Sequence, residues 1–257
     1  YENQLQSDAD LDKIKTPCIT YDKEETEKIF SMAQEIFDGI LDIQLNGSIP
    51  YLSIWDFISQ VMPIEDALYA FIDRPEFMHE LARRVRDGYL VTLDQVEEQG
   101  LLPRHQSLIH CTGAYCDELP ADDFNPEKPR CKDNWMFGLA QMFSTVSPEM
   151  FDEFEVKYTS QICERFGLVY YGCCDPLDGK MEQVRKIPNV RKVSMSPWTN
   201  PEKGAEGIGK DFVFSSKPNP ANLAMEAFNE DIIRKELETI KSACDRNGCP
   251  LEFILKD

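Results

Sequence analysis

The chain has 257 residues, of which 42% are hydrophobic and 28% are charged, and its formal net charge is −19. These totals are typical of a globular protein with one large domain or two small ones. So much negative charge repels nucleic acid phosphates and anionic membrane surfaces, which excludes both as general partners. No apolar run approaches the ~18 residues that a membrane span needs, and the first residues carry no signal-peptide pattern.

Nine cysteines are spread irregularly along the chain. An odd number at irregular spacing argues against a disulfide framework in a chain of this length. We therefore expect a reducing, cytoplasmic environment in which most of the thiols are small buried groups. Two or three of them remain candidates for metal ligands.

The first predicted elements are a helix and a strand. Over 23–40, apolar residues recur at helical spacing, and a cluster of glutamates at the start of this segment suits a helix N-terminus. Over 40–47, apolar and polar residues alternate up to Asn46 and Gly47, which predicts a strand followed by a turn.

A long amphipathic helix is predicted over 74–100, with Pro75 in its first turn and Gly100 at its end. Residues 106–113 are typical of a short strand. The segment that follows, 112–135, is rich in proline and aspartate and predicts a long irregular insertion, and loops of this length are usually functional or disordered.

From residue 135 onward, predicted strands and helices alternate. The predicted strands are 135–143, 168–174, 190–197, 211–219 and 251–257. The predicted helices are 147–167, 178–187, 200–209 and 229–248. Such alternation implies parallel pairing with right-handed crossovers, in an α/β barrel or a doubly wound sheet. No glycine-rich phosphate-binding motif follows any of these strands, which argues against a nucleotide site.

Chemically active residues gather at the predicted strand ends, where both architectures bind ligands. They are Gln141, Ser144, Cys173, Cys174, Asp175, Ser196, Trp198, Lys217, Asn219, Lys256 and Asp257. The alternative is that strand ends are where turns begin, so that polar residues are expected there in any case.

Four stretches, taken in order and spacing, resemble the C-terminal two-thirds of the uroporphyrinogen decarboxylase superfamily. They read FSTVSPEMFDEFEVKY, LVYYGCCDPLD, IPNVRKVSMSPW and FVFSSKPNPANLA. The resemblance runs from about residue 8 to the end. It implies a single TIM-type (β/α)8 barrel domain over 1–257 that lacks its first strands and last helix in this chain, with 112–135 as an insertion near the barrel mouth. It also implies that the five strands lie adjacent in chain order.

The superfamily contains zinc-dependent methyltransferases that pass methyl groups from corrinoid proteins or methylated substrates to a thiol. Where those enzymes have a His-x-Cys-Gly motif, this chain has Tyr171, Gly172, Cys173 and Cys174. The resemblance implies that Cys173 is a zinc ligand, whereas the residues alone favour two small core groups. The methyltransferases' further zinc cysteine falls near Asp257, where no cysteine stands, and the decarboxylases' arginine-rich motif is not recognisable.

Strand alternation predicts that Cys173 and Cys174 point to opposite faces, so that one enters the barrel mouth and the other packs against helices. His110 and Cys111 are candidate further ligands, as is Cys174 if a bulge turns it inward. The remaining predicted roles are catalytic for His110, Gln141 and Lys217, and substrate-binding for Ser144, Trp198, Asn219 and Asp257. The competing interpretations are a backbone-capping role for His110, a solvated Lys217 and a packed Trp198.

The sequence therefore favours a cytoplasmic methyltransferase that uses zinc, with a small-molecule substrate and a corrinoid protein as partner. Two alternatives remain open. One is uroporphyrinogen III decarboxylation, and the other is a non-catalytic partner subunit in which the metal site has been lost.

Overall fold

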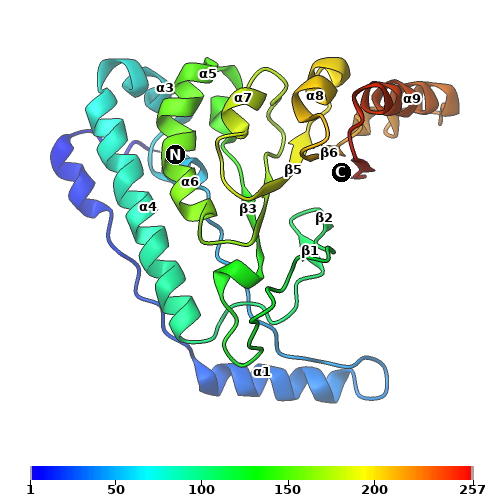
Figure 1. Ribbon diagram of the computed structural model, residues 1–257. Helices are drawn as coiled ribbons and strands as arrows, with labels where there is room; N and C mark the ends of the chain where they lie inside the picture. The colour runs from blue at the N-terminus through cyan, green and yellow to red at the C-terminus, as the bar shows by residue number, and fades with distance from the viewer. Residues whose placement is uncertain (1, 256–257) are drawn as a thin grey trace.

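Five parallel strands form the main sheet of the computed structural model, which describes residues 2–255 (Figure 1). They are β3 (Trp135–Gly138), β4 (Leu168–Tyr171), β5 (Val190–Met195), β6 (Val213–Ser216) and β7 (Leu251–Phe253). Each strand pairs in parallel with the next one along the chain. The predicted mixed α/β class, strand order and strand direction are confirmed.

Helices precede and connect these strands. They are α1 (Lys23–Ile36), α2 (Ile54–Val61), α3 (Ile64–Asp73), α4 (Pro75–Glu98), α5 (Pro148–Phe151), α6 (Lys157–Cys163), α7 (Met181–Val184), α8 (Pro201–Ile208) and α9 (Glu230–Asn247). A π-helical turn, Asp152–Val156, joins α5 to α6. Ser147 caps α5, because its hydroxyl accepts a hydrogen bond from the amide of Met150 at 3.2 Å.

The two faces of the sheet are covered differently. The helix-facing side chains of the strands join the main hydrophobic core: Met136, Val169, Tyr171, Val193, Met195 and Phe214. The opposite face carries Trp135, Leu168 and Tyr170, which form a smaller apolar cluster with residues around a two-stranded hairpin. This hairpin is β1 (Leu108–Ile109) with β2 (Thr112–Gly113), and it pairs antiparallel.

An ion pair holds the hairpin against the sheet. Lys192 on β5 lies 3.0 Å from the carboxylate of Glu252 on β7, and its Nζ donates to the carbonyl oxygen of Gly113 at 2.9 Å. Glu252 also accepts a hydrogen bond from the hydroxyl of Thr112 at 2.9 Å. A buried cation needs such partners, because desolvation penalises its charge.

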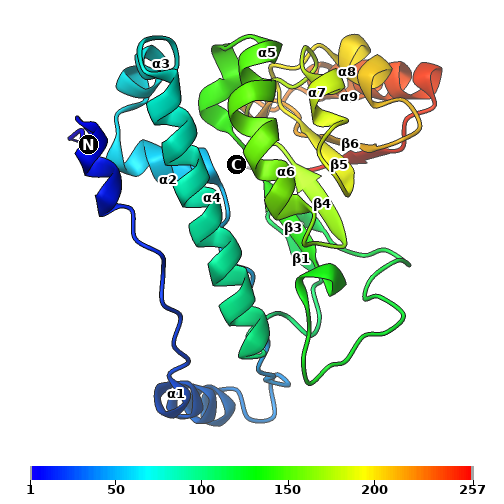
Figure 2. The same cartoon turned by 60° about the vertical axis from the view of Figure 1, so that its left-hand side comes forward.

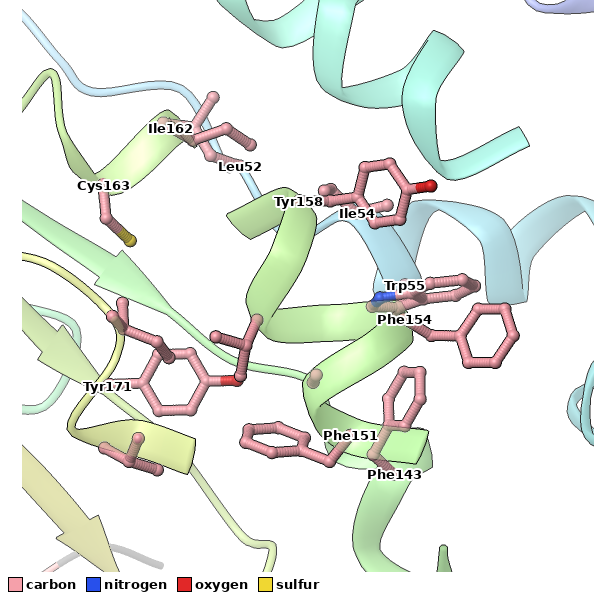
Figure 3. Close-up of a cluster of buried hydrophobic side chains, with 14 of the residues drawn as sticks. Leu52, Ile54, Trp55, Phe143, Phe151, Phe154, Tyr158, Ile162, Cys163 and Tyr171 are labelled. Atoms are coloured by element: carbon pink, nitrogen blue, oxygen red, sulfur yellow. The ribbon is translucent and has the colours of Figure 1, made fainter. Parts of the chain in front are cut away.

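An aromatic cluster joins the N-terminal helices to the helix layer of the sheet (Figure 3). The Trp55 ring of α2 lies edge-on to Phe143 with the centroids 5.1 Å apart, and Phe71 of α3 lies 4.6 Å from Phe154. Phe151 is fully buried beside them and meets Tyr171 edge-on at 6.2 Å. Aromatic pairs of this geometry contribute beyond the area that they bury.

Two sequence-based predictions about local structure are wrong. Residues 41–50 form neither strand nor helix, because Ile40, Leu41 and Leu45 are exposed and no strand pairs with the segment. The strand predicted over 135–143 ends at Gly138, and a 3₁₀ helix follows at Gln141–Thr145. The helix predicted over 23–40 is confirmed as α1, which ends at Ile36, and none of its side chains is buried.

The insertion at 112–135 lies at the end of the sheet where the strands begin. Glu118 pairs with Arg191 at the start of β5, at 2.5 Å, and Leu119 lies against Gly167, directly before β4. The strands end on the other side, so the insertion is placed away from the end of the sheet that carries Cys173.

Replacing Phe151 by alanine is expected to lower the free energy of unfolding by about 3–5 kcal/mol, because it opens a cavity in the aromatic cluster. Urea denaturation of the two proteins measures the difference. Phe228→Ala is the control: this side chain is 72% exposed, and its loss is expected to change the free energy by no more than ~0.5 kcal/mol. Equal effects for the two variants would contradict the described core.

Candidate functional site

The strand β4 ends before the two adjacent thiols. Tyr171 is its last residue, and the tyrosine side chain turns toward the helix layer, where its hydroxyl donates to Glu155 Oε1 at 2.9 Å (Figure 3). Gly172 then adopts φ +93°, and a Cβ there would lie 2.5 Å from Leu177 Cδ1. Glycine is required on both counts, and side-chain alternation stops at this residue.

Cys173 and Cys174 therefore do not follow the alternation of a strand, which predicts that their side chains point to opposite faces of the sheet. Cys173 is 4% exposed and faces the hairpin side, whereas Cys174 is exposed instead of packing against helices. Their sulfur atoms are 3.6 Å apart. The prediction that Cys174 packs against the helices is therefore wrong, because the turn at Gly172 ends the strand geometry on which it depended.

Three neighbouring groups fix the backbone of Cys173. Its amide donates to Asp175 Oδ1 at 3.2 Å, and its carbonyl oxygen accepts from the Ser194 hydroxyl at 2.8 Å and from Lys217 Nζ at 3.0 Å. Lys217 is 6% exposed, so the interpretation of a solvated loop lysine is wrong. The turn after β4 is thus tied to β5 and β6.

His110 reaches this thiol from the hairpin. It occupies the turn between β1 and β2 with φ +52°, which is uncommon for a residue other than glycine. Its ring stacks on Phe137 of β3 with the centroids 4.1 Å apart and the planes 8° apart. In that position its Nε2 lies 3.7 Å from the sulfur of Cys173. An imidazole and a thiol, distant in sequence, are brought together.

Two separations around Cys173 are compatible with the spacing of zinc ligands. Ligands of tetrahedral zinc lie roughly 3.5–3.8 Å apart when the zinc–sulfur distance is ~2.3 Å and the zinc–nitrogen distance is ~2.0 Å. The separations of Cys173 from His110 and from Cys174 fit this range. Within residues 2–255, however, no three His, Cys, Asp or Glu side chains form a group that could hold a metal ion. Cys111 contacts the hydroxyl of Tyr170 at 3.9 Å instead.

A cavity of about 400 Å³ opens beside His110. His110, Trp135 and Phe137 form one part of its wall, and Tyr51 and Ser107 form another. The Tyr51 hydroxyl donates to Asp56 at 2.6 Å, and burial together with that carboxylate raises the pKa of Tyr51 well above its usual value. The size suits a small molecule. The sequence offered no signal for Tyr51, because its segment carries no regular periodicity.

Two buried carboxyl groups flank the turn on its helix side. Glu155, in the π-helical turn, is 1% exposed, and burial raises its pKa to about 8 although Tyr171 and Thr159 donate to it. Asp175 is 2% exposed, and burial raises its pKa as well. π-helical turns often occur at functional sites, but a sequence pattern of α-helical period hides them.

The other residues predicted for the site lie apart from Cys173 and His110. Gln141 is exposed in its 3₁₀ helix, where its carbonyl oxygen accepts from the Ser144 hydroxyl at 2.5 Å. Trp198 is 74% exposed, so the packing interpretation is wrong. Asn219 caps a short 3₁₀ helix and lines a second cavity together with Lys217. Asp257 lies outside the described residues.

No protein-family model matches this chain, and comparison with curated proteins finds no match. Among the described helices, none combines the length and apolar character needed to cross a bilayer. Among the described residues, no disulfide joins any two cysteines.

The stability of the protein is expected to fall as the pH rises from about 5 to 8. The pKa of Glu155 is about 8 in the folded state against 4.5 ordinarily, so over this range the folded state keeps a proton that the unfolded state has released. The slope contributed by one such group is about 1.4 kcal/mol per pH unit. Glu155→Gln removes this contribution, and Asp175 retains its own, which has the same sign.

Urea denaturation at several pH values measures the effect. As the pH rises, the unfolding free energy of the wild type should fall more steeply than that of the Glu155→Gln variant. Glu164→Gln, an exposed position in the same helical segment, should run parallel to the wild type. Parallel curves for all three proteins would show that Glu155 does not hold its proton in the folded state.

Proposed function

We propose that this chain is an enzyme of the uroporphyrinogen decarboxylase type that transfers a methyl group to a thiol. The observation that carries the proposal is the pair formed by the Cys173 sulfur and His110 Nε2, 3.7 Å apart at the carboxyl end of a parallel strand. Five parallel strands in chain order are compatible with a (β/α)8 barrel. Ligands bind at the carboxyl ends of the strands in that fold.

The chemistry required is activation of a thiol as thiolate, which is the nucleophilic form. When the acceptor thiol of the substrate lies next to Cys173, His110 is placed to accept the proton of that thiol. The thiolate sulfur then forms a bond to the methyl carbon, while the bond from that carbon to its donor breaks and the electron pair leaves with the donor. The cavity beside His110 would hold the small-molecule substrate.

Lys217 and Ser194 position Cys173 through its carbonyl oxygen and do not contact its sulfur in these bonds. In this proposal they hold the thiol still relative to His110. A 1 Å displacement of a reacting group can lower the rate about 100-fold, so the two donors are positioning residues.

Zinc, when bound, would supply a Lewis acid that keeps a thiol deprotonated at neutral pH. Cys173 would hold it, with Cys174 as the nearest further ligand, because His110 Nε2 serves as the proton acceptor in this proposal. A corrinoid protein is the proposed methyl donor, and the cytoplasm, which keeps thiols reduced, is the proposed location.

One observation favours a second candidate, a non-catalytic partner subunit. Among residues 2–255, no group of three side chains is arranged as a metal site, whereas catalytic zinc usually has about three protein ligands. A chain that binds no zinc and transfers no methyl group would fit this candidate.

Purified wild-type protein is expected to contain close to one zinc ion per chain, measured by elemental analysis after dialysis. The Cys173→Ser variant should lose the zinc, because the substitution removes the thiolate that is the proposed first ligand. Cys18→Ser, at an exposed thiol remote from the pair, should retain it. Zinc retained in full by Cys173→Ser would refute the proposed metal site.

His110→Gln is expected to slow methyl transfer from methylcobalamin to a small thiol at least tenfold at neutral pH, because no base then stands beside Cys173. Visible absorbance of the corrinoid follows the loss of its methyl group. Circular dichroism establishes that the variant is folded. A rate equal to that of the wild type would remove His110 from the mechanism, and no rate above background in the wild type would favour the non-catalytic candidate.

A further inference from the structure

A second cavity, of about 500 Å³, lies at the carboxyl ends of β5 and β6, against α9. It shares no lining residue with the cavity beside His110. Its polar lining consists of Ser196, Thr199, Ser216, Lys217, Asn219, Asn222, Lys235, Glu236 and Thr239. Apart from Lys217, which positions Cys173, no residue of this lining has a role in the proposed methyl transfer.

Two hydroxyl groups in its wall have unmet hydrogen-bonding capacity. Ser196 is 4% exposed and Thr199 is 9% exposed, and over residues 2–255 neither hydroxyl oxygen has a hydrogen-bond partner. Buried polar groups are nearly always hydrogen-bonded, so each exception needs an explanation. Both residues line the same cavity, and a bound molecule with acceptor atoms would supply the missing partners.

The charge around the cavity favours an anion. Lys217 and Lys235 both line it, and within the described part of the chain neither forms an ion pair with a carboxylate. Lys217 uses one of its three donors on the carbonyl oxygen of Cys173. The single carboxylate of the lining, Glu236, is already engaged, because its two oxygens accept from the Asn219 amide at 2.8 Å and the Asn222 side chain at 2.6 Å.

The rest of the wall is apolar. Met195 and Phe214 come from the sheet, and Ile232 and Ile240 come from α9. Such a surface buries a short hydrocarbon or aromatic body, while a few polar groups fix its orientation. The lining therefore matches a molecule with one anionic end and one apolar end.

We propose that this cavity is a second ligand site, which binds a small organic anion with a carboxylate or phosphate head group and an apolar body. The head group lies within reach of Lys235 and accepts hydrogen bonds from the hydroxyls of Ser196 and Thr199. The apolar body packs between Phe214 and Ile240. This site goes beyond the proposed methyl transfer and shares only Lys217 with it.

The test uses isothermal titration calorimetry on the full chain with benzoate, phenyl phosphate and neutral benzamide as probes. Benzoate or phenyl phosphate is expected to bind at least tenfold more tightly than benzamide. Whichever anion binds more tightly identifies the head group as carboxylate or phosphate. Equal binding of the three probes, or no binding of either anion at millimolar concentration, would overturn the proposal.

Variants then locate the binding. Lys235→Gln is expected to weaken anion binding at least tenfold, and the double variant Ser196→Ala with Thr199→Val should weaken it at least threefold. Lys241→Gln is the matched control, since Lys241 lies on the same helix, pairs with Asp245 and does not line the cavity. Unchanged affinity in Lys235→Gln, or an equal loss in the control, would place the anion elsewhere and refute the site.

Discussion

The carbonyl oxygen of Cys173 is the acceptor on which the candidate site depends. Ser194 on β5 and Lys217 after β6 both donate to it, so the ends of three neighbouring strands meet at one atom. A hydrogen bond to a buried charged donor contributes more than a neutral one, and leaving that donor without a partner is costly. The position of the thiol is therefore coupled to the burial of a lysine.

The other side of the same turn explains the tyrosine at position 171. Here the Tyr171 hydroxyl bonds to the buried Glu155 in the helix layer, so the side chain acts in packing. The imidazole near Cys173 comes from His110 on the hairpin.

Much of the fold could be predicted from local patterns, because parallel strands and their connecting helices alternate with clear periodicity. The order of β3 to β7 and the bounds of α4 and α9 follow from that periodicity. The strand expected at 40–47 failed, since alternation alone does not supply a pairing partner.

The candidate site was predictable only in part. Cys173 and Lys217 follow from their places after two strands, whereas the hydrogen bond between them spans the intervening strand β5 and has no local signal in the sequence. The approach of His110 depends on a hairpin that packs on the sheet through Lys192 and Glu252, a contact distant in sequence. The exposed place of Cys174 depends on one positive φ angle at Gly172. Neither the approach of His110 nor the exposure of Cys174 corresponds to a local pattern in the sequence.

The helix α1 differs from every helix that covers the sheet. Figures 1 and 2 show it apart from the other helices, and none of its side chains is buried. Its order depends on its own cap, in which Asp22 accepts from the amide of Glu25, and on local pairs such as Lys28 with Glu25. Isolated helices of roughly 12–15 residues are marginal in water. Amide hydrogens in α1 should therefore exchange with solvent through local opening, long before those of β4 and β5, which exchange only when the core itself opens.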